Sequence, residues 1–148
     1  MHGKIHSVIF ILRSVVIIKL YKTHARAVLT FLLGGFLYGA TEILWRGYTH
    51  PAMLILGGFC LSVIYSLEGK LATRSPIFAR SLCYAFIITS AEFVSGVVLN
   101  LILGMDIWDY SGLPLNILGQ VCPTFFFVWF LLSFFCCFLC RAIRFAFS

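Results

Sequence analysis

Two charged side chains stand one helical turn apart in an apolar part of the chain. Glu42 and Arg46 lie in the stretch ATEILWRGYTH, which closes the first long apolar run. Residues four apart share one face of a helix, so this carboxylate and this guanidinium can pair. Gly35 and Gly39 precede them on that face and allow another helix to approach closely. The pair predicts either a ligand-binding or ion-coupling site, or an ion pair that fixes the end of a helix.

A second polar column belongs to a later apolar run. Glu92 sits near the middle of that run, and Gly96, Asn100 and Gly104 follow at four-residue steps. This spacing puts all four residues on one helix face. Ionisable side chains within membrane helices are rare and usually functional, because burying charge in hydrocarbon is costly. We expect Glu92 and Asn100 to bind a ligand or couple to an ion, with interhelical hydrogen bonding as the alternative.

Two short polar segments follow the apolar runs that carry these acids. They read WRGYTHP and WDYSGLP, and each contains a Trp, a Tyr, a charge, a hydroxyl group and a closing Pro. We predict that they form a gate over the polar site, made of Tyr48, Thr49, His50, Trp108, Asp109, Tyr110 and Asn116. The alternative is an aromatic belt at the membrane–water interface. His50 alone would be typical of a solvated loop residue.

The composition indicates the class of protein in which these polar residues lie. The chain has 148 residues, of which 61% are hydrophobic and 11% are charged. A soluble domain is about 45–50% apolar and about 25% charged. A chain this short cannot hide such an apolar excess in one core. The sequence therefore predicts an integral membrane protein.

Four apolar runs approach or exceed the ~20 residues that a helix needs to cross a bilayer. They are Ala27–Trp45, Pro51–Leu67, Ile77–Met105 and Leu115–Cys140. The connections are short, so neighbouring helices should pack as antiparallel hairpins. We predict an all-α polytopic membrane protein whose four transmembrane helices form a bundle.

The basic residues predict the orientation. They precede the first run (Lys4, Arg13, Lys19, Lys22 and Arg26), follow the second (Lys70, Arg74 and Arg80) and follow the fourth (Arg141 and Arg144). Positively charged segments favour the cytoplasmic side, so both termini are expected there. We divide the chain into a basic segment (residues 1–26), a membrane domain (27–140) and a basic tail (141–148). The first segment is predicted to be an interfacial helix, although residues 5–20 could instead span. Glu68, at the end of the second run, is expected to be solvated.

Several classes of function lack support in the sequence. The net charge of +6 would suit nucleic acid, but the basic residues flank apolar runs and form no stripe with aromatic residues. Cys137-x-x-Cys140 has no second Cys or His pair, so no metal is predicted. There is no phosphate-binding loop, HExxH or GxSxG motif. A lipid-headgroup enzyme with Glu42 or Asp109 as base would lack a nucleophile. We predict no enzyme and no cofactor.

Two long stretches of the chain resemble a known family. They are GGFLYGATEILWRGYTHPAMLILGGFCLSVIYSLE and EFVSGVVLNLILGMDIWDYSGLPLNILGQVCPTFFFVWFLLS. They are similar to the small bacterial type IV ABC-transporter permeases, also called CmpB-like, over about Gly34–Ser133. Residues before Arg26 and after Ser133 lie outside the resemblance. It implies a transport-linked membrane subunit and supplies no substrate or catalytic residue.

Together these features predict a subunit of a transport system in the bacterial plasma membrane. Glu42, Arg46, Glu92 and Asn100 would line a crevice that opens to the outer face and binds a small solute or cation. An ATP-binding subunit or a second membrane subunit would come from another chain, and a homodimer is possible because four spans are few for a complete pathway. The alternative is a structural or interaction protein whose polar residues only hold the helices together.

Overall fold

The computed structural model describes the backbone of residues 2–147 and the side chains of residues 13–147. Its helices are α1 (His2–Arg46), α2 (Pro51–Leu71), α3 (Ile77–Gly96), the short π-helix η1 (Val97–Ile102) and α4 (Pro123–Ala146). The described residues form no strand. Four segments are long and apolar enough to cross a membrane: Arg13–Arg46, Pro51–Leu71, Ile77–Ile102 and Pro123–Ala146. The all-α, four-span prediction is confirmed.

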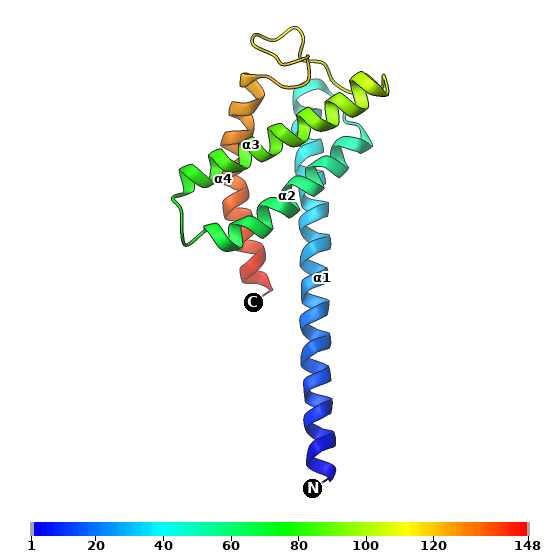
Figure 1. Cartoon of the computed structure of the whole chain (residues 1–148), viewed down its shortest axis with the longest axis vertical. Coiled ribbons are helices and arrows are strands. Elements are labelled where there is room, and N and C mark those ends of the chain that lie inside the picture. Colours follow the sequence, from blue (N-terminus) through cyan, green and yellow to red (C-terminus); the bar gives the residue numbers. More distant parts are fainter. Residues whose placement is uncertain (1, 148) are drawn as a thin grey trace.

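The helices are arranged as two antiparallel hairpins (Figure 1). α1 packs chiefly on α2, and α3 packs chiefly on α4, while weaker contacts join α2 to α3 and α4. α1 and α4 run along the long axis of the molecule, and α2 and α3 cross it obliquely (Figure 1). The connections 47–50 and 103–122 lie at one end of the bundle, here called the loop end. The α2–α3 turn and the end of α4 lie toward the opposite, basic end.

Glycines allow α1 and α2 to approach closely. A Cβ atom added at Gly57 would lie 2.7 Å from the carbonyl oxygen of Gly34, and one added at Gly35 would lie 2.7 Å from that of Leu54. Any larger side chain would therefore force the backbones apart. Gly35 has the packing role that its spacing predicted.

The first helix is longer than the sequence suggested. α1 continues through Arg26 without a break, so the described part of the predicted N-terminal segment is collinear with the first span. No Pro or Gly lies between Lys4 and Leu33 to interrupt the helix. This N-terminal half projects beyond the rest of the bundle (Figure 1). The side chain of Lys4 lies outside the described residues, and the membrane boundaries at residues 26 and 140 stay predictions.

The boundaries of the last two spans differ from those predicted. The third ends at Ile102, and Gly104 (φ 63°) and Asp106 (φ 48°) follow it in the left-handed region. A Cβ atom added at Gly104 would meet no other atom within 4 Å, so this glycine does not open a helix contact as predicted. The fourth span begins at Pro123 rather than Leu115, because Leu115 and Leu118 also have positive φ, which an α-helix cannot contain.

The prediction that Glu68 is solvated is wrong. Glu68 is 1% exposed, and its carboxylate lies 2.9 Å from Nη1 of Arg80. The hydroxyl group of Tyr84 donates to the other carboxylate oxygen at 2.7 Å. Arg80 and Tyr84 are one turn apart on α3 and face Glu68 across the α2–α3 turn. The ion pair thus ties α2 to α3 near the basic end.

Candidate functional site

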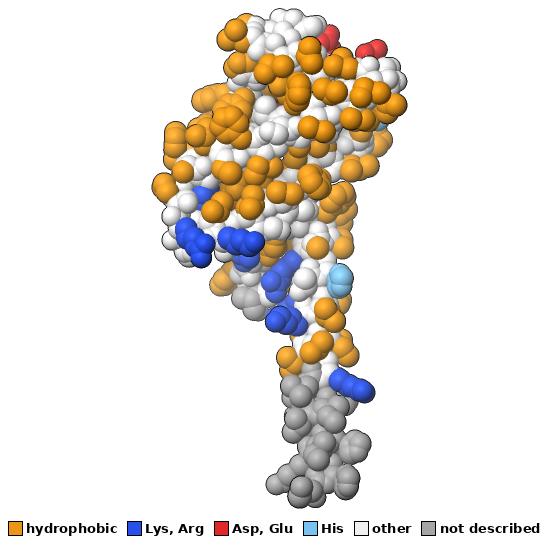
Figure 2. Space-filling view, viewed as in Figure 1, with side chains coloured by type: hydrophobic (Ala, Val, Ile, Leu, Met, Phe, Trp, Pro, Cys, Tyr) orange, Lys and Arg blue, Asp and Glu red, His pale blue; other side chains and the backbone are white. Residues whose placement is uncertain are grey.

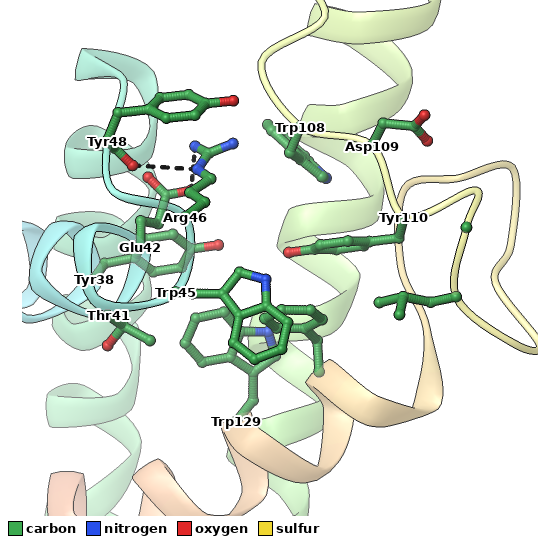
Figure 3. A pocket seen from close by; sticks show the side chains of 13 residues that line it. Tyr38, Thr41, Glu42, Trp45, Arg46, Tyr48, Trp108, Asp109, Tyr110 and Trp129 are labelled. Atoms are coloured by element: carbon green, nitrogen blue, oxygen red, sulfur yellow. Dashed lines mark hydrogen bonds and ion pairs between the residues drawn. The ribbon is translucent and has the colours of Figure 1, made fainter.

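A pocket opens at the loop end between α1, α4 and the 103–122 connection (Figure 3). Its volume is about 420 Å³. Most of its lining side chains are aromatic, and two of its charged residues are Glu42 and Arg46. The lining residues are Tyr38, Thr41, Glu42, Trp45, Arg46, Tyr48, Trp108, Asp109, Tyr110, Gly112, Leu113, Phe125 and Trp129. The pocket therefore joins parts of the chain that are far apart in sequence.

Glu42 and Arg46 form the ion pair that their spacing predicted. Nη2 of Arg46 lies 2.6 Å from Oε1 of Glu42, and the hydroxyl group of Thr49 donates to Oε2 at 2.5 Å. The side chains of Glu42 and Arg46 are only 11% and 16% exposed, respectively. Both oxygens of Glu42 thus have donors from the end of α1 and the connection that follows it.

Every guanidinium nitrogen of Arg46 donates to the protein. Besides the bond to Glu42, Nη1 donates to the carbonyl oxygen of Ile107, and Nε donates to that of Tyr48 at 3.3 Å. The guanidinium also lies 4.5 Å from the ring centroid of Tyr48 (Figure 3). Arg46 therefore fastens the end of α1 to both loop-end connections, and its charge is paired with the Glu42 carboxylate.

Stacked rings form the walls of the pocket. Tyr38 stacks on Trp129 with centroids 4.9 Å apart, and Tyr110 stacks on Phe125 at 4.4 Å. Trp45 meets Phe125 edge to face at 5.2 Å. These contacts link α1, α4 and the second connection, so the walls hold one another in place.

Glu92 lies behind this aromatic wall rather than in the pocket. It is fully buried, and its carboxylate accepts bonds from the Tyr38 hydroxyl group and, at 2.6 Å, from Nε1 of Trp129. Both donors are neutral, and both rings line the pocket. No Lys or Arg among the described residues forms an ion pair with Glu92. Glu92 thus positions two rings of the pocket and places a carboxyl group directly behind them.

Asn100 orders the second connection. Its Nδ2 donates to the carbonyl oxygen of Trp108 at 2.9 Å and to Oε1 of Gln120 at 2.8 Å. Its Oδ1 accepts from the backbone N–H of Ile107 at 2.8 Å. Asn100 is 6% exposed and does not line the pocket. Asn100 therefore fixes the backbone of Ile107, whose carbonyl oxygen accepts from Arg46, and of Trp108, which lines the pocket.

The predicted gate residues separate into two groups. Tyr48, Trp108, Asp109 and Tyr110 line the pocket, whereas Thr49, His50 and Asn116 do not. His50 caps α2, because its Nδ1 accepts from the N–H of Ala52 at 3.2 Å. Thr49 supports Glu42 as described above. Asn116 bonds within the second connection, to the carbonyl oxygens of Ser111 and Leu113 and to the N–H of Gly119.

The pKa values of two groups in the second connection, Asp109 and Tyr110, are shifted by their surroundings. The hydroxyl and backbone N–H groups of Ser111 donate to Asp109 at 2.7 and 2.8 Å, which lowers the pKa of that exposed carboxyl below 3.8. Burial raises the pKa of Tyr110, and the negative charges of Glu92 and Glu42 raise it further, with Arg46 opposing them. The Tyr110 hydroxyl group therefore stays protonated at neutral pH.

Sequence reasoning missed much of the pocket wall. Tyr38 and Trp129, the partners of Glu92, and Phe125 lie in apolar runs where an aromatic residue needs no special explanation. Tyr38 alone could have been selected, because it lies four residues before Glu42 on the same helix face. Trp129 and Phe125 depend on how α4 packs, which no local pattern reveals.

Comparison with known protein families assigns the chain to a family. A family model described as "Putative ABC-transporter type IV" matches residues 8–147. The chain belongs to this family. The match extends past Gly34–Ser133 in both directions, so the long N-terminal part of α1 and the end of α4 are within the family region, contrary to the coverage expected. No curated protein and no solved structure matches the chain. The family and the four apolar helices make it a membrane protein related to ABC transporters.

Proposed function

We propose that the protein is a membrane subunit of a transport system and binds a small cationic solute in the loop-end pocket. The observation that carries this proposal is that the one basic side chain among the described residues of the pocket, Arg46, is hydrogen-bonded and paired with Glu42. It is the one Lys or Arg among the described lining residues, and each of its nitrogens already donates to the protein. Its positive charge is paired with Glu42, so an anionic solute would find no unpaired cation there.

The carboxyl groups favour a cation. Glu42 lines the pocket, Asp109 lies on its loop side, and Glu92 lies behind Tyr38 and Trp129. Arg46 pairs with Glu42, so Asp109 is the lining carboxylate without a basic partner among the described residues. Aromatic faces attract cations as well, by about 0.5–1 kcal/mol each when exposed and about 2 kcal/mol or more when desolvated. A pocket that combines such rings with one carboxylate in excess of its arginine suits an ammonium or a similar small cation.

The size and rigidity of the pocket suit a small solute. Its volume of about 420 Å³ lies near the lower end of the ~300–1,000 Å³ range of ligand pockets. Interlocked rings limit the loss of side-chain freedom when a ligand binds, which favours affinity.

The orientation is part of the proposal. On the face shown in Figure 2, the Lys and Arg side chains lie away from the loop end and the acidic side chains lie at it, while Arg46 at the loop end is paired with Glu42. The positive-inside rule then places the pocket on the outer face of a bacterial plasma membrane and both termini in the cytoplasm. An ATP-binding subunit, a second membrane subunit or a second copy of this chain would complete the transport pathway.

The alternative role, a structural membrane protein, draws on the same contacts. Glu92, Asn100 and Arg46 all have protein partners, so each stabilises the bundle whether or not a solute binds. The two roles differ in one respect: a structural protein has no specific affinity for a cation. Ligand-induced stabilisation therefore separates them.

Thermal unfolding of the purified protein in detergent tests the proposal. Tetramethylammonium chloride is compared with sodium chloride at equal ionic strength and with neutral tert-butanol. A ligand at 100 times its dissociation constant stabilises a protein by about 2.7 kcal/mol, so tetramethylammonium should raise the Tm while the other two additions do not. Equal Tm values in all three solutions would support the structural role instead.

Two matched variants locate the binding site. Glu42→Gln removes a lining carboxylate and leaves Arg46 unbalanced, so the stabilisation by tetramethylammonium should disappear. Asp106→Asn removes an exposed acid of the same connection region that does not line the pocket, so it should retain the stabilisation. Loss of the effect in both variants, or in neither, would contradict the assignment to the pocket.

A further inference from the structure

Two arginines from different helices donate hydrogen bonds near the basic end. Arg26 of α1 donates from Nη2 to the carbonyl oxygen of Phe147 at 3.3 Å, and Arg144 of α4 donates from Nη2 to that of Tyr65. The guanidinium of Arg144 also lies 4.2 Å from the ring centroid of Tyr65. Helices α1, α2 and α4 therefore bring two half-buried positive charges to the end of α4.

A glycine of α2 makes room for Arg144. A Cβ atom added at Gly69 would lie 2.7 Å from Cζ and 2.8 Å from Nη1 of Arg144. Lys70, which is exposed, follows directly and adds a third positive charge to this part of α2. The position thus accommodates a guanidinium that lies against the helix backbone.

These charges have no counter-ion among the described residues. The chain has five acidic residues, and the one near this end, Glu68, pairs with Arg80 and Tyr84. No described carboxylate forms an ion pair with Arg26 or Arg144. Nε of each arginine is buried without a hydrogen-bond partner, and no described residue accepts a hydrogen bond from Nη1 of either. Each half-buried guanidinium therefore keeps donors that no described residue uses.

The surroundings of the cluster are those of a membrane interface. Val28 is 58% exposed and Phe145 is 85% exposed, beside Arg26 and Arg144 in sequence. The Lys and Arg side chains gather where the apolar surface of the bundle gives way to the projecting part of α1 (Figure 2). A ligand here would have its charge against the arginines and an apolar part against the helices. Free phosphate lacks the second feature, and an anionic lipid has both.

We propose that Arg26, Arg144 and Lys70 bind the phosphate of an anionic lipid headgroup at the ends of α1, α2 and α4. Arginine forms paired hydrogen bonds with phosphate oxygens, and basic pockets between membrane helices suit such headgroups. Bound there, the lipid joins α1 to α4, whose backbones contact each other less than those of α1 and α2 or of α3 and α4. The site does not depend on the loop-end pocket or on any solute bound there.

Native mass spectrometry of the full chain in detergent tests this site. The protein is mixed with phosphatidylglycerol or with phosphatidylcholine of the same acyl chains, and the bound fraction is measured. Phosphatidylglycerol should bind preferentially, and Arg26→Gln/Arg144→Gln should lose that preference. Each basic residue near anionic lipid contributes about 1 kcal/mol, so affinity should fall about fivefold for each charge removed.

Matched variants and a soluble competitor decide the outcome. Arg13→Gln/Arg74→Gln removes two exposed basic residues outside the cluster and should keep the preference. Lys70→Gln, at an exposed position that no described core contact requires, should weaken binding about fivefold even if the double arginine variant unfolds. Equal binding of both lipids by the wild type, or no effect of Lys70→Gln, would overturn the proposal. Displacement of lipid by millimolar inorganic phosphate would overturn the assignment to a lipid.

Discussion

Removing the carboxylate of Glu68 should strongly destabilise the bundle. Its side chain has no exposed surface, and that of Arg80 is 6% exposed. Glu68→Ala leaves the Arg80 guanidinium buried without its partner, which costs about 3–5 kcal/mol. It also removes the acceptor of the Tyr84 hydroxyl group, and an unsatisfied buried donor costs about 1–3 kcal/mol. The free energy of unfolding should therefore fall by about 4 kcal/mol or more. A solvated ion pair would contribute only about 0–1 kcal/mol.

Urea unfolding in detergent micelles, followed by circular dichroism, measures this loss. Asp106→Asn serves as the control, because Asp106 is an exposed acid and Asn tolerates its left-handed backbone (φ 48°). Glu68→Met/Arg80→Met should recover most of the stability, since it removes both buried charges together. A Glu68→Ala variant within about 1 kcal/mol of the control, the range of a solvated pair, or a double variant no better than the single one, would refute the buried ion pair.

Three further changes probe the helix contact, the second connection and its exposed acid. Gly57→Ala should cost about 1–3 kcal/mol, because the added Cβ meets the α1 backbone and side chains, while Gly112→Ala, which meets no atom within 4 Å, should leave the Tm unchanged. Asn100→Ala removes three hydrogen bonds that order residues 107–120, so limited proteolysis should cleave this region faster than in the wild type. Ser111→Ala should raise the pKa of Asp109 toward 3.8 in an NMR titration, because both the hydroxyl and the backbone N–H of residue 111 stabilise the carboxylate and one is lost. The depressed pKa means that this stabilisation exists above pH 3.8 and disappears as the carboxyl group is protonated.

The sequence predicted the features that depend on short-range patterns. Four apolar runs predicted four spans, and the i, i+4 spacing predicted the pairing of Glu42 with Arg46. The glycines of α1 predicted a close helix contact. Each of these follows from helix geometry and from the cost of exposing polar groups to lipid.

Features that depend on packing between distant segments were not predictable. Glu92 lies behind the pocket because Tyr38 and Trp129 come from two other helices and donate to it. Glu68 is buried because Arg80 and Tyr84 face it across a turn, whereas its place near a helix end suggested solvent. Burial of a single acid is therefore decided by its partners rather than by its position along a span.

The assignment of a cation to the loop-end pocket can be measured by tryptophan fluorescence. The chain has three Trp residues, and all of them, Trp45, Trp108 and Trp129, line the pocket. Titration of the wild type with tetramethylammonium should change the emission with a saturable dependence on concentration, and Glu42→Gln should abolish the change. If tetramethylammonium leaves the tryptophan emission unchanged, or if sodium acetate changes it equally, cation binding in this pocket is contradicted.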